Sequence, residues 1–142
     1  MFPEQRAGSH VSRTILVVDD DADIRSLIRT FLEHEGYNVH TCEDADRAVH
    51  IFRRSPGIDL LITDFSMPER SGLDLAREIK SIRPSLPVLI VSGAVMADTE
   101  LAQMRIREWN FLPKPFSLPQ LLSEVHRILD PTRSRGSATL TA

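Results

Sequence analysis

Residues that could transfer a phosphoryl group stand directly after short apolar runs of this sequence. The carboxylates are those of Asp19, Asp20 and Asp64, and two further runs are followed by the hydroxyl of Ser92 and the ammonium of Lys114. A carboxylate can attack phosphorus while a cation, an ammonium and a hydroxyl neutralise the oxygens of the transferring group. These residue types therefore favour phosphoryl transfer, provided that the fold brings them together.

The acidic residues would need a counter-charge at such a site. Carboxylates held within several ångströms repel one another, and without a cation at least one of them takes up a proton. Lys114 supplies one positive charge, and a hard divalent ion held by carboxylate oxygens and water, Mg²⁺ or Mn²⁺, would supply the rest. Zinc is a poor candidate because no His or Cys stands at these positions.

Position in the sequence separates the roles of these residues. Asp64 stands alone after its apolar run, which makes it the best candidate nucleophile, whereas Asp19 and Asp20 are adjacent and suit metal binding. Ser92 would donate its hydroxyl to a phosphoryl oxygen, and Gly93 beside it would leave space for the group. The run 19–21 could also be a plain helix N-terminus, where acidic residues complement the helix dipole.

The elements that must position these residues alternate in their periodicity. Short apolar runs, rich in β-branched residues, predict buried strands at 15–18, 60–62, 88–91 and, more weakly, 111–112, while the alternating segment 37–41 predicts an edge strand. Apolar stripes with helical spacing separate the strands. The stripes consist of Ile24, Leu27, Ile28 and Phe31; Ala45, Ala48, Val49 and Phe52; Leu75, Ile79 and Ile82; Ala97, Leu101 and Met104; and Leu118, Leu121, Leu122, Val125 and Leu129.

Helix boundaries are also visible in the sequence. Asp44 and Ser71 are expected N-caps, Gly36 is a plausible residue just past a helix end, and Ser117 with Gln120 fits a capping box.

The fold class predicted by this alternation is α/β, a (βα)5 doubly wound sandwich. Strands separated by helices form a parallel five-stranded sheet with helices on both faces. The pattern alone leaves the strand order open, and 2-1-3-4-5, the flavodoxin-like order, is a common solution and our expectation. Because parallel strands end at one edge, the candidate residues should meet there.

Composition narrows the class of protein further. The chain has 142 residues, a formal net charge of -3 and 42% hydrophobic residues, which predicts one globular domain at 13–129 with flexible ends at 1–12 and 130–142. Scattered, outnumbered basic residues argue against direct nucleic-acid binding. One cysteine, Cys42, excludes an internal disulfide, and no apolar run approaches a membrane span or a signal peptide. We therefore expect a cytoplasmic protein.

Five segments together resemble the receiver domain of two-component response regulators. They are residues 15–21 (ILVVDDD), 59–64 (DLLITD), 67–72 (MPERSG), 87–93 (PVLIVSG) and 111–116 (FLPKPF), and the resemblance covers about 13–129. Any one segment is weak evidence, but their order and spacing together are specific.

The resemblance implies a role for each residue of the acidic site. Asp64 would accept the phosphoryl group from a phosphohistidine, and Asp20 and Asp64 would bind Mg²⁺ through their carboxylates. Asp19 would act mainly through bound water, and Ser66 would offer its backbone carbonyl to the metal. Lys114 would pair with the phosphoryl group.

The resemblance also implies a conformational switch. Ser92 would move toward the phosphate, and the ring of Phe111 would follow into the vacated space. The Lys114–Pro115 peptide bond would be cis. Two departures stand out: residues 106–109 (IREW) replace the usual small-Gly-small segment, and Phe111 has no hydroxyl with which to signal.

The implied partners are a sensor histidine kinase or a histidine phosphotransfer protein, together with an unidentified output protein. The chain would be a monomer or a dimer formed on activation, and its only catalysis would be its own phosphorylation and dephosphorylation. Two alternatives stay open. One is a pseudo-receiver that binds partners without phosphorylation, and the other, less favoured, is a small Mg²⁺-dependent phosphatase.

Overall fold

Five parallel strands form a single sheet in the computed structural model, which describes residues 12–93 and 109–130. The strands are β1 (Thr14–Val18), β2 (Asn38–Cys42), β3 (Leu60–Asp64), β4 (Val88–Ser92) and β5 (Asn110–Pro113). Their order in the sheet is β2-β1-β3-β4-β5, and every neighbouring pair is parallel. The predicted flavodoxin-like order is confirmed.

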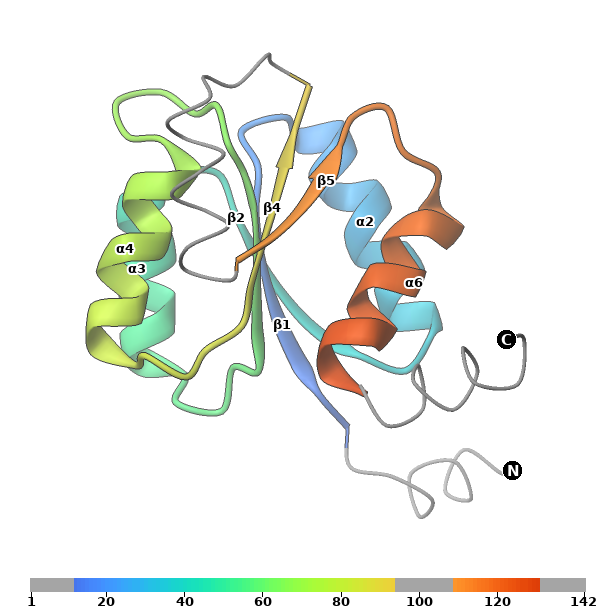
Figure 1. Ribbon diagram of the computed structural model, residues 1–142, viewed down its shortest axis with the longest axis horizontal. Coiled ribbons are helices and arrows are strands. Elements are labelled where there is room, and N and C mark those ends of the chain that lie inside the picture. Colours follow the sequence, from blue (N-terminus) through green and yellow to red (C-terminus); the bar gives the residue numbers. More distant parts are fainter. Residues whose placement is uncertain (1–11, 94–108, 131–142) are drawn as a thin grey trace.

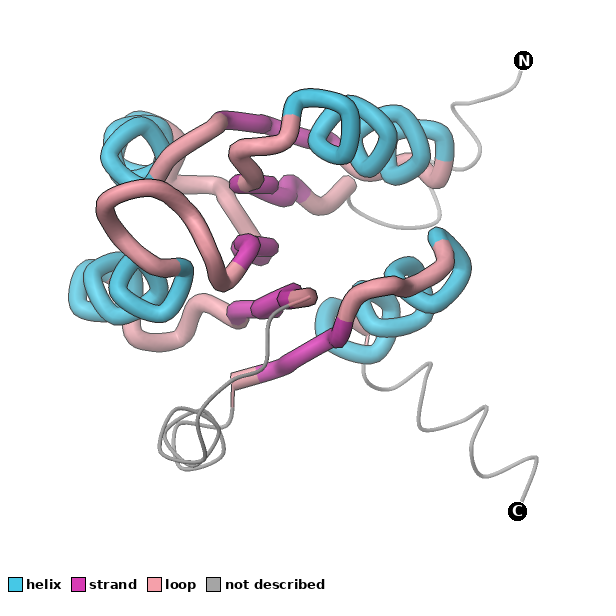
Figure 2. The backbone as a smooth tube through the Cα atoms, turned by 90° about the horizontal axis from the view of Figure 1, so that it is seen from above, coloured by secondary structure: helices cyan, strands magenta, loops and turns pink. Residues whose placement is uncertain are grey.

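Helices cover both faces of the sheet. α3 (Ala45–Arg54) and α4 (Gly72–Ile82) lie on one face, and α2 (Ala22–His34) and α6 (Leu118–Leu129) lie on the other (Figure 1). Seen from above, the strands form a layer between the two pairs of helices (Figure 2). This is the doubly wound arrangement that the alternating periodicity predicts.

The helix caps follow the sequence signals. The side chains of Asp44, Ser71 and Ser117 each accept a backbone N–H of the first helical turn, and Ser71 and Ser117 form capping boxes with Asp74 and Gln120. Gly36 follows the end of α2 with φ 101°, a conformation that glycine adopts without a steric penalty.

Two apolar clusters fill the spaces between the sheet and its helices. Leu16, Leu61 and Ile90 face α3 and α4, whereas Ile15, Ile62 and Leu89 face α2 and α6. Because side chains alternate along a strand, β1, β3 and β4 bury apolar residues on both faces. Their continuous apolar runs have this cause, while β2, at the sheet edge, alternates as predicted.

In the part of the predicted apolar stripes that the structure describes, two residues are exposed. Leu27 is 56% exposed because the buried face of α2 is centred on Ile28 and Leu32, and Ile82 is exposed at the last position of α4. Cys42 and Trp109 are buried packing residues.

Some expectations fall beyond the described residues. The predicted helix around Leu101 and Met104 lies there, as do residues 106–108 of the unusual segment before β5. The expected flexible ends at 1–12 and 130–142 also lie there, except for residues 12 and 130. Among the helices in the described ranges, none is long and apolar enough to cross a bilayer.

Candidate functional site

The candidate residues meet at the carboxyl edge of the sheet. Asp19 follows β1, Asp64 is the last residue of β3, Ser92 is the last residue of β4, and Lys114 follows β5. In the strand register Asp64 lies opposite Val91 and Ser92 lies opposite Pro113. Residues separated by as many as 95 positions in the sequence are therefore neighbours, as the parallel topology requires.

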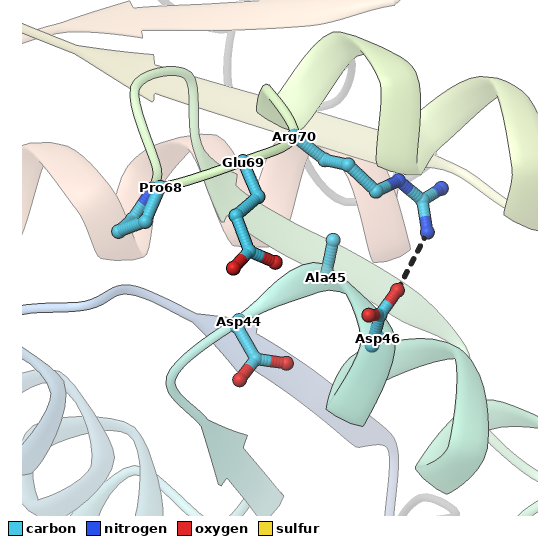
Figure 3. Close-up of a pocket in the computed structure, with 6 residues that line it drawn as sticks. All are labelled: Asp44, Ala45, Asp46, Pro68, Glu69 and Arg70. Atoms are coloured by element: carbon cyan, nitrogen blue, oxygen red, sulfur yellow. Dashed lines mark hydrogen bonds and ion pairs between the residues drawn. The ribbon is translucent and has the colours of Figure 1, made fainter.

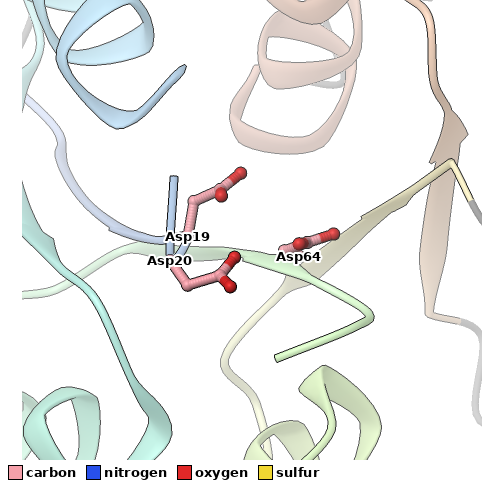
Figure 4. A group of neighbouring side chains, drawn as sticks. All are labelled: Asp19, Asp20 and Asp64. Atoms are coloured by element: carbon pink, nitrogen blue, oxygen red, sulfur yellow. The ribbon is translucent and has the colours of Figure 1, made fainter. Parts of the chain in front are cut away.

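Three carboxylates form a cluster at this edge. Asp19, Asp20 and Asp64 each offer an oxygen, and these oxygens all lie within 4.8 Å of one another. Figure 4 shows the three side chains approaching from the end of β1 and the end of β3. Asp19 and Asp64 are buried, whereas Asp20 is exposed and keeps the cluster open to solvent.

Lys114 supplies the positive charge of the cluster. Its Nζ lies 3.5 Å from Asp64 Oδ1 and 3.6 Å from Asp19 Oδ2. Its backbone N–H donates to the Ser92 carbonyl at 2.7 Å, and the bond to Pro115 is cis, as the resemblance implies. Within the described residues, and with all groups ionised, three carboxylates face one ammonium, which leaves an excess of two negative charges.

Burial dominates the electrostatics of Asp64. Loss of solvent raises the pKa of this carboxyl group, the ammonium of Lys114 works in the opposite direction, and the charges of Asp19 and Asp20 raise the pKa further. The ammonium therefore does not fully compensate the carboxylate, and a further cation would stabilise its ionised form.

The donor set fits a magnesium ion. Asp19 Oδ2 is buried and has no hydrogen-bond partner in the described part of the chain, while Asp19 Oδ1 accepts the N–H of Asp21 at 2.9 Å. Opposite ligands of Mg²⁺ lie about 4.2 Å apart, so oxygens spaced as in this cluster can surround the ion directly or through water. All the donors are hard oxygen atoms. The cluster of Asp19, Asp20 and Asp64 is thus consistent with a divalent metal site.

The remaining predicted residues lie on β4, on β5 and in the loops that follow the strands. Ser92 is buried, and Phe111 on β5 lies opposite Ile90, half-buried against the apolar cluster on the α4 side. Ser66 is exposed in the loop after β3. A Cβ added at Gly93 would lie 3.4 Å from Lys114 Cβ, an ordinary van der Waals contact, so Gly93 lies beside the stem of the lysine.

Gly72 supports the site in a way that the sequence analysis did not assign. A Cβ there would lie 2.2 Å from the backbone carbonyl oxygen of Asp64, and the Gly72 N–H donates to the Phe65 carbonyl at 2.8 Å. The first turn of α4 is thus packed directly against the candidate nucleophile's backbone. The signal in the sequence is a glycine placed just after the N-cap Ser71, where a better helix former would be expected.

Two arginines with partners in other parts of the fold also escaped the sequence analysis. Arg25 of α2 donates to the Asp19 carbonyl at 2.7 Å, and Arg70 pairs with Asp46 of α3 and Glu78 of α4. Asp21, the third residue of the acidic run, caps α2 by accepting from the N–H groups of Asp23 and Ile24. The run therefore serves both as a helix cap and as part of the acidic cluster.

Comparison with known proteins agrees with this geometry. The family model described as "Response regulator receiver domain" matches residues 15–126. The chain is 36% identical over 124 residues to the DNA-binding transcriptional regulator NtrC of Rhizobium meliloti, a match that covers 87% of this chain and 25% of NtrC. It is 32% identical over 128 residues to the response regulator MprA of Mycobacterium bovis, covering 90% of this chain and 55% of MprA.

A solved structure matches most of this chain. The response regulator receiver protein from Pseudomonas putida is 32% identical, superposes with a TM-score of 0.77, and the match covers 83% of this chain and 98% of that one. The chain thus spans from about a quarter to just over half the length of the two curated relatives. With the acidic cluster and its lysine in place, the chain belongs to the response regulator receiver domain family of two-component signalling.

Proposed function

We propose that this receiver accepts a phosphoryl group from a phosphohistidine onto Asp64 and thereby changes a protein-binding surface. The observation that carries the proposal is the position of Asp64: its carboxylate lies in a cluster with Asp19 and Asp20 and 3.5 Å from the Lys114 ammonium. One nucleophile, a metal-binding acidic set and one fixed cation are the parts that phosphoryl transfer needs.

The transfer follows from these positions. An oxygen of Asp64 forms a bond to phosphorus while the bond from phosphorus to the donor's imidazole nitrogen breaks, and that nitrogen keeps the electron pair. Lys114 pairs with an oxygen of the transferring group, and the Ser92 hydroxyl donates to another. Asp19, Asp20, Asp64 and the Ser66 carbonyl would hold Mg²⁺, which neutralises negative charge on the phosphoryl oxygens when it is bound.

The same residues support a route from phosphorylation to a surface change. Ser92 at the end of β4 and Phe111 on β5 lie on the same face of the sheet, since Phe111 pairs with Ile90, two residues before Ser92. A shift of Ser92 toward the phosphoryl group would open space on that face for the half-buried ring. The ring can transmit the signal through packing alone.

Partners follow from the family. Receiver domains pair with histidine kinases, so the donor would be a sensor kinase or a phosphotransfer protein in the cytoplasm, and the output protein is not identified. The relative NtrC is a DNA-binding transcriptional regulator, but this chain matches a quarter of it. The receiver could act as a monomer or dimerise on activation.

A receiver is a signalling domain rather than a conventional enzyme. Sustained turnover of phosphate esters would instead favour the phosphatase alternative.

Intact-mass spectrometry after incubation with acetyl phosphate and Mg²⁺ tests the proposal. The wild-type protein should gain one phosphoryl group, Asp64→Asn should gain none, and Asp23→Asn, which removes an exposed carboxylate outside the cluster, should label like the wild type. Equal labelling of Asp64→Asn would show that another residue is the acceptor.

Beryllofluoride separates a working receiver from a pseudo-receiver. With Mg²⁺, it should shift the amide NMR signals of Ser92 and Phe111 in the wild type and leave those of Asp64→Asn unchanged. An unchanged wild-type spectrum, together with absent labelling, would favour a scaffold that works without phosphorylation.

A further inference from the structure

The loop of residues 65–71 carries Ser66 away from Asp64 and delivers the chain to α4. Its beginning is well anchored: the Phe65 N–H donates to the Val91 carbonyl at 2.8 Å, and Phe65 and Met67 pack against the apolar cluster on the α4 side. Its end is closed by the hydrogen bond from Gly72 to the Phe65 carbonyl. Between these anchors the chain must make a turn at the surface.

The outer part of this loop has little packing to hold it. Ser66, Pro68 and Glu69 are exposed. Glu69 has φ 71°, a left-handed conformation that a residue with a Cβ adopts at a steric penalty. A loop with an exposed apex and one unfavourable backbone conformation needs an external contact to keep a single shape.

Arg70 provides that contact by bridging two helices. Its Nη1 lies 3.0 Å from Asp46 Oδ1 of α3, and its Nη2 pairs with Glu78 Oε1 of α4. Figure 3 shows the side chain extending from the loop toward the N-terminal turn of α3, with Glu69 and Pro68 beside it. The Arg70 side chain is 31% exposed, so its charge is partly shielded from solvent.

We propose that Arg70 is a positioning residue for the metal site: by tying the loop to α3 and α4, it holds the Ser66 carbonyl where Mg²⁺ binding requires it. This inference rests on the proposed function, because Ser66 acts there as a backbone ligand. A single exposed ion pair contributes little, but one guanidinium shared between two acids on separate helices forms a small network that joins the loop to both helices.

Replacing Arg70 would change the affinity for Mg²⁺ in one direction if Arg70 positions the loop and in the other if it acts only through its charge. Arg70 and Mg²⁺ are both cations, so any field that Arg70 exerts at the metal site opposes the approach of Mg²⁺. Removing its charge would strengthen Mg²⁺ binding if only the field mattered. If Arg70 orders the loop, removing it weakens binding, because part of the binding free energy is then spent on ordering the chain.

Calorimetric titration with Mg²⁺ measures directly whether the dissociation constant rises or falls. In Arg70→Met, which keeps an unbranched apolar side chain without the charge, we expect the dissociation constant for Mg²⁺ to rise about five- to tenfold, the low end of the usual coupling between sites. Arg70→Lys, which can pair with one acid at a time, should fall between Arg70→Met and the wild type. Arg29→Met is the matched control, because Arg29 pairs with Glu33 within the same helix, α2.

Hydrogen exchange in the metal-free protein gives an independent measurement. The amides of residues 66–70 should exchange faster in Arg70→Met than in the wild type, while the amides of β3 stay unchanged. Asp46→Asn and Glu78→Gln should each give part of the acceleration, and neither should add to it in the Arg70→Met background.

The outcomes separate this inference from the proposed function. An unchanged or tighter Mg²⁺ dissociation constant in Arg70→Met, with wild-type exchange in the loop, would overturn the positioning role while leaving Asp64 as the acceptor. A wild-type protein that binds no Mg²⁺ and gains no phosphoryl group would overturn the proposed function itself.

Discussion

The interior of the sheet and the end of β3 at the carboxyl edge are both buried, yet burial has opposite consequences in the two regions. β3 passes through both: Leu60, Leu61 and Ile62 lie between the helix layers, and the same strand ends at Asp64, which is 7% exposed. Burying the leucines removes apolar surface from water and stabilises the fold. Burying Asp64 beside two other carboxylates opposes folding, because a charge loses its hydration.

This difference indicates that the core supports a site that is unfavourable for stability on its own. Substitutions in the core should therefore destabilise the protein, whereas removing charge from the edge should stabilise it and abolish the chemistry. The predictions below test this contrast, beginning with the largest expected effect.

Leu61→Ala should lower the free energy of unfolding by about 3 kcal/mol, since it removes a fully buried side chain from the central strand and leaves a cavity. Urea denaturation followed by circular dichroism measures the change. Leu27→Ala is the matched control, because Leu27 is 56% exposed and its loss should change stability by less than about 0.5 kcal/mol. Similar losses in the two variants would contradict the assignment of the core.

Gly72→Ala tests whether the edge is packed as tightly as the interior. The added Cβ would lie 2.2 Å from the Asp64 carbonyl oxygen, so either α4 or the end of β3 must move. We expect a loss of about 2 kcal/mol in the free energy of unfolding, together with slower phosphorylation by acetyl phosphate. Gly57→Ala, where a Cβ meets nothing within 4 Å, is the control and should leave both measurements near the wild type.

Asp64→Asn should raise the free energy of unfolding by about 1 kcal/mol at pH 7, because it removes one of three clustered negative charges. The pKa of Asp64 is raised in the folded protein, chiefly by burial, so the folded state holds this proton more tightly than the unfolded state. The wild type therefore loses stability as the pH rises through the folded pKa of Asp64, and the variant does not.

The stabilising effect of Asp64→Asn should depend on both pH and metal. It should be present at neutral pH and vanish in acid, below the ordinary pKa of an aspartate, where Asp64 is protonated in both states. Saturating Mg²⁺ should reduce it, since the ion stabilises the wild type more than the variant. Thermal midpoints measured across pH, with and without Mg²⁺, test both statements. A variant less stable than the wild type at pH 7 without metal would contradict the electrostatic picture.

Features with a local physical cause could be predicted from the sequence. The strands follow from apolar runs, and Asp44, Ser71 and Ser117 are caps because their side chains accept nearby backbone N–H groups. The proximity of Asp64 and Lys114 was also predictable, since parallel strands all end at the same edge of the sheet. Strand order was left open by the pattern, because periodicity does not encode which strands are neighbours.

Contacts that depend on the detailed three-dimensional arrangement could not be predicted. Arg70 pairs with Asp46, which lies 24 positions earlier, and no local pattern links the two residues. Gly72 is an ordinary-looking glycine until α4 is placed against the end of β3. The exposure of Leu27 likewise depends on how α2 is rotated on the sheet, which a stripe of apolar residues defines only to within a neighbouring position.

Backbone conformation gives a smaller contrast between two turns. Gly36, beyond the end of α2, and Glu69, in the loop after β3, both have positive φ, 101° and 71° respectively. Glycine meets no steric penalty at such an angle, whereas glutamate does. The turn at Gly36, away from the carboxyl edge, is therefore relaxed, and the turn at Glu69, beside that edge, is strained.

Glu69→Gly should raise the free energy of unfolding by about 0.5 kcal/mol, because relief of the unfavourable backbone angle exceeds the extra freedom that glycine gives to the unfolded chain. Glu69→Ala removes the same carboxylate but keeps the Cβ, so it should not reproduce the gain. Gly36→Ala, at a site with nothing within 4 Å, should lose about 1 kcal/mol for the converse reason. Equal stability of Glu69→Gly and Glu69→Ala in urea denaturation would assign any gain to charge, and the loop beside Asp64 would then be no more strained than the turn at Gly36.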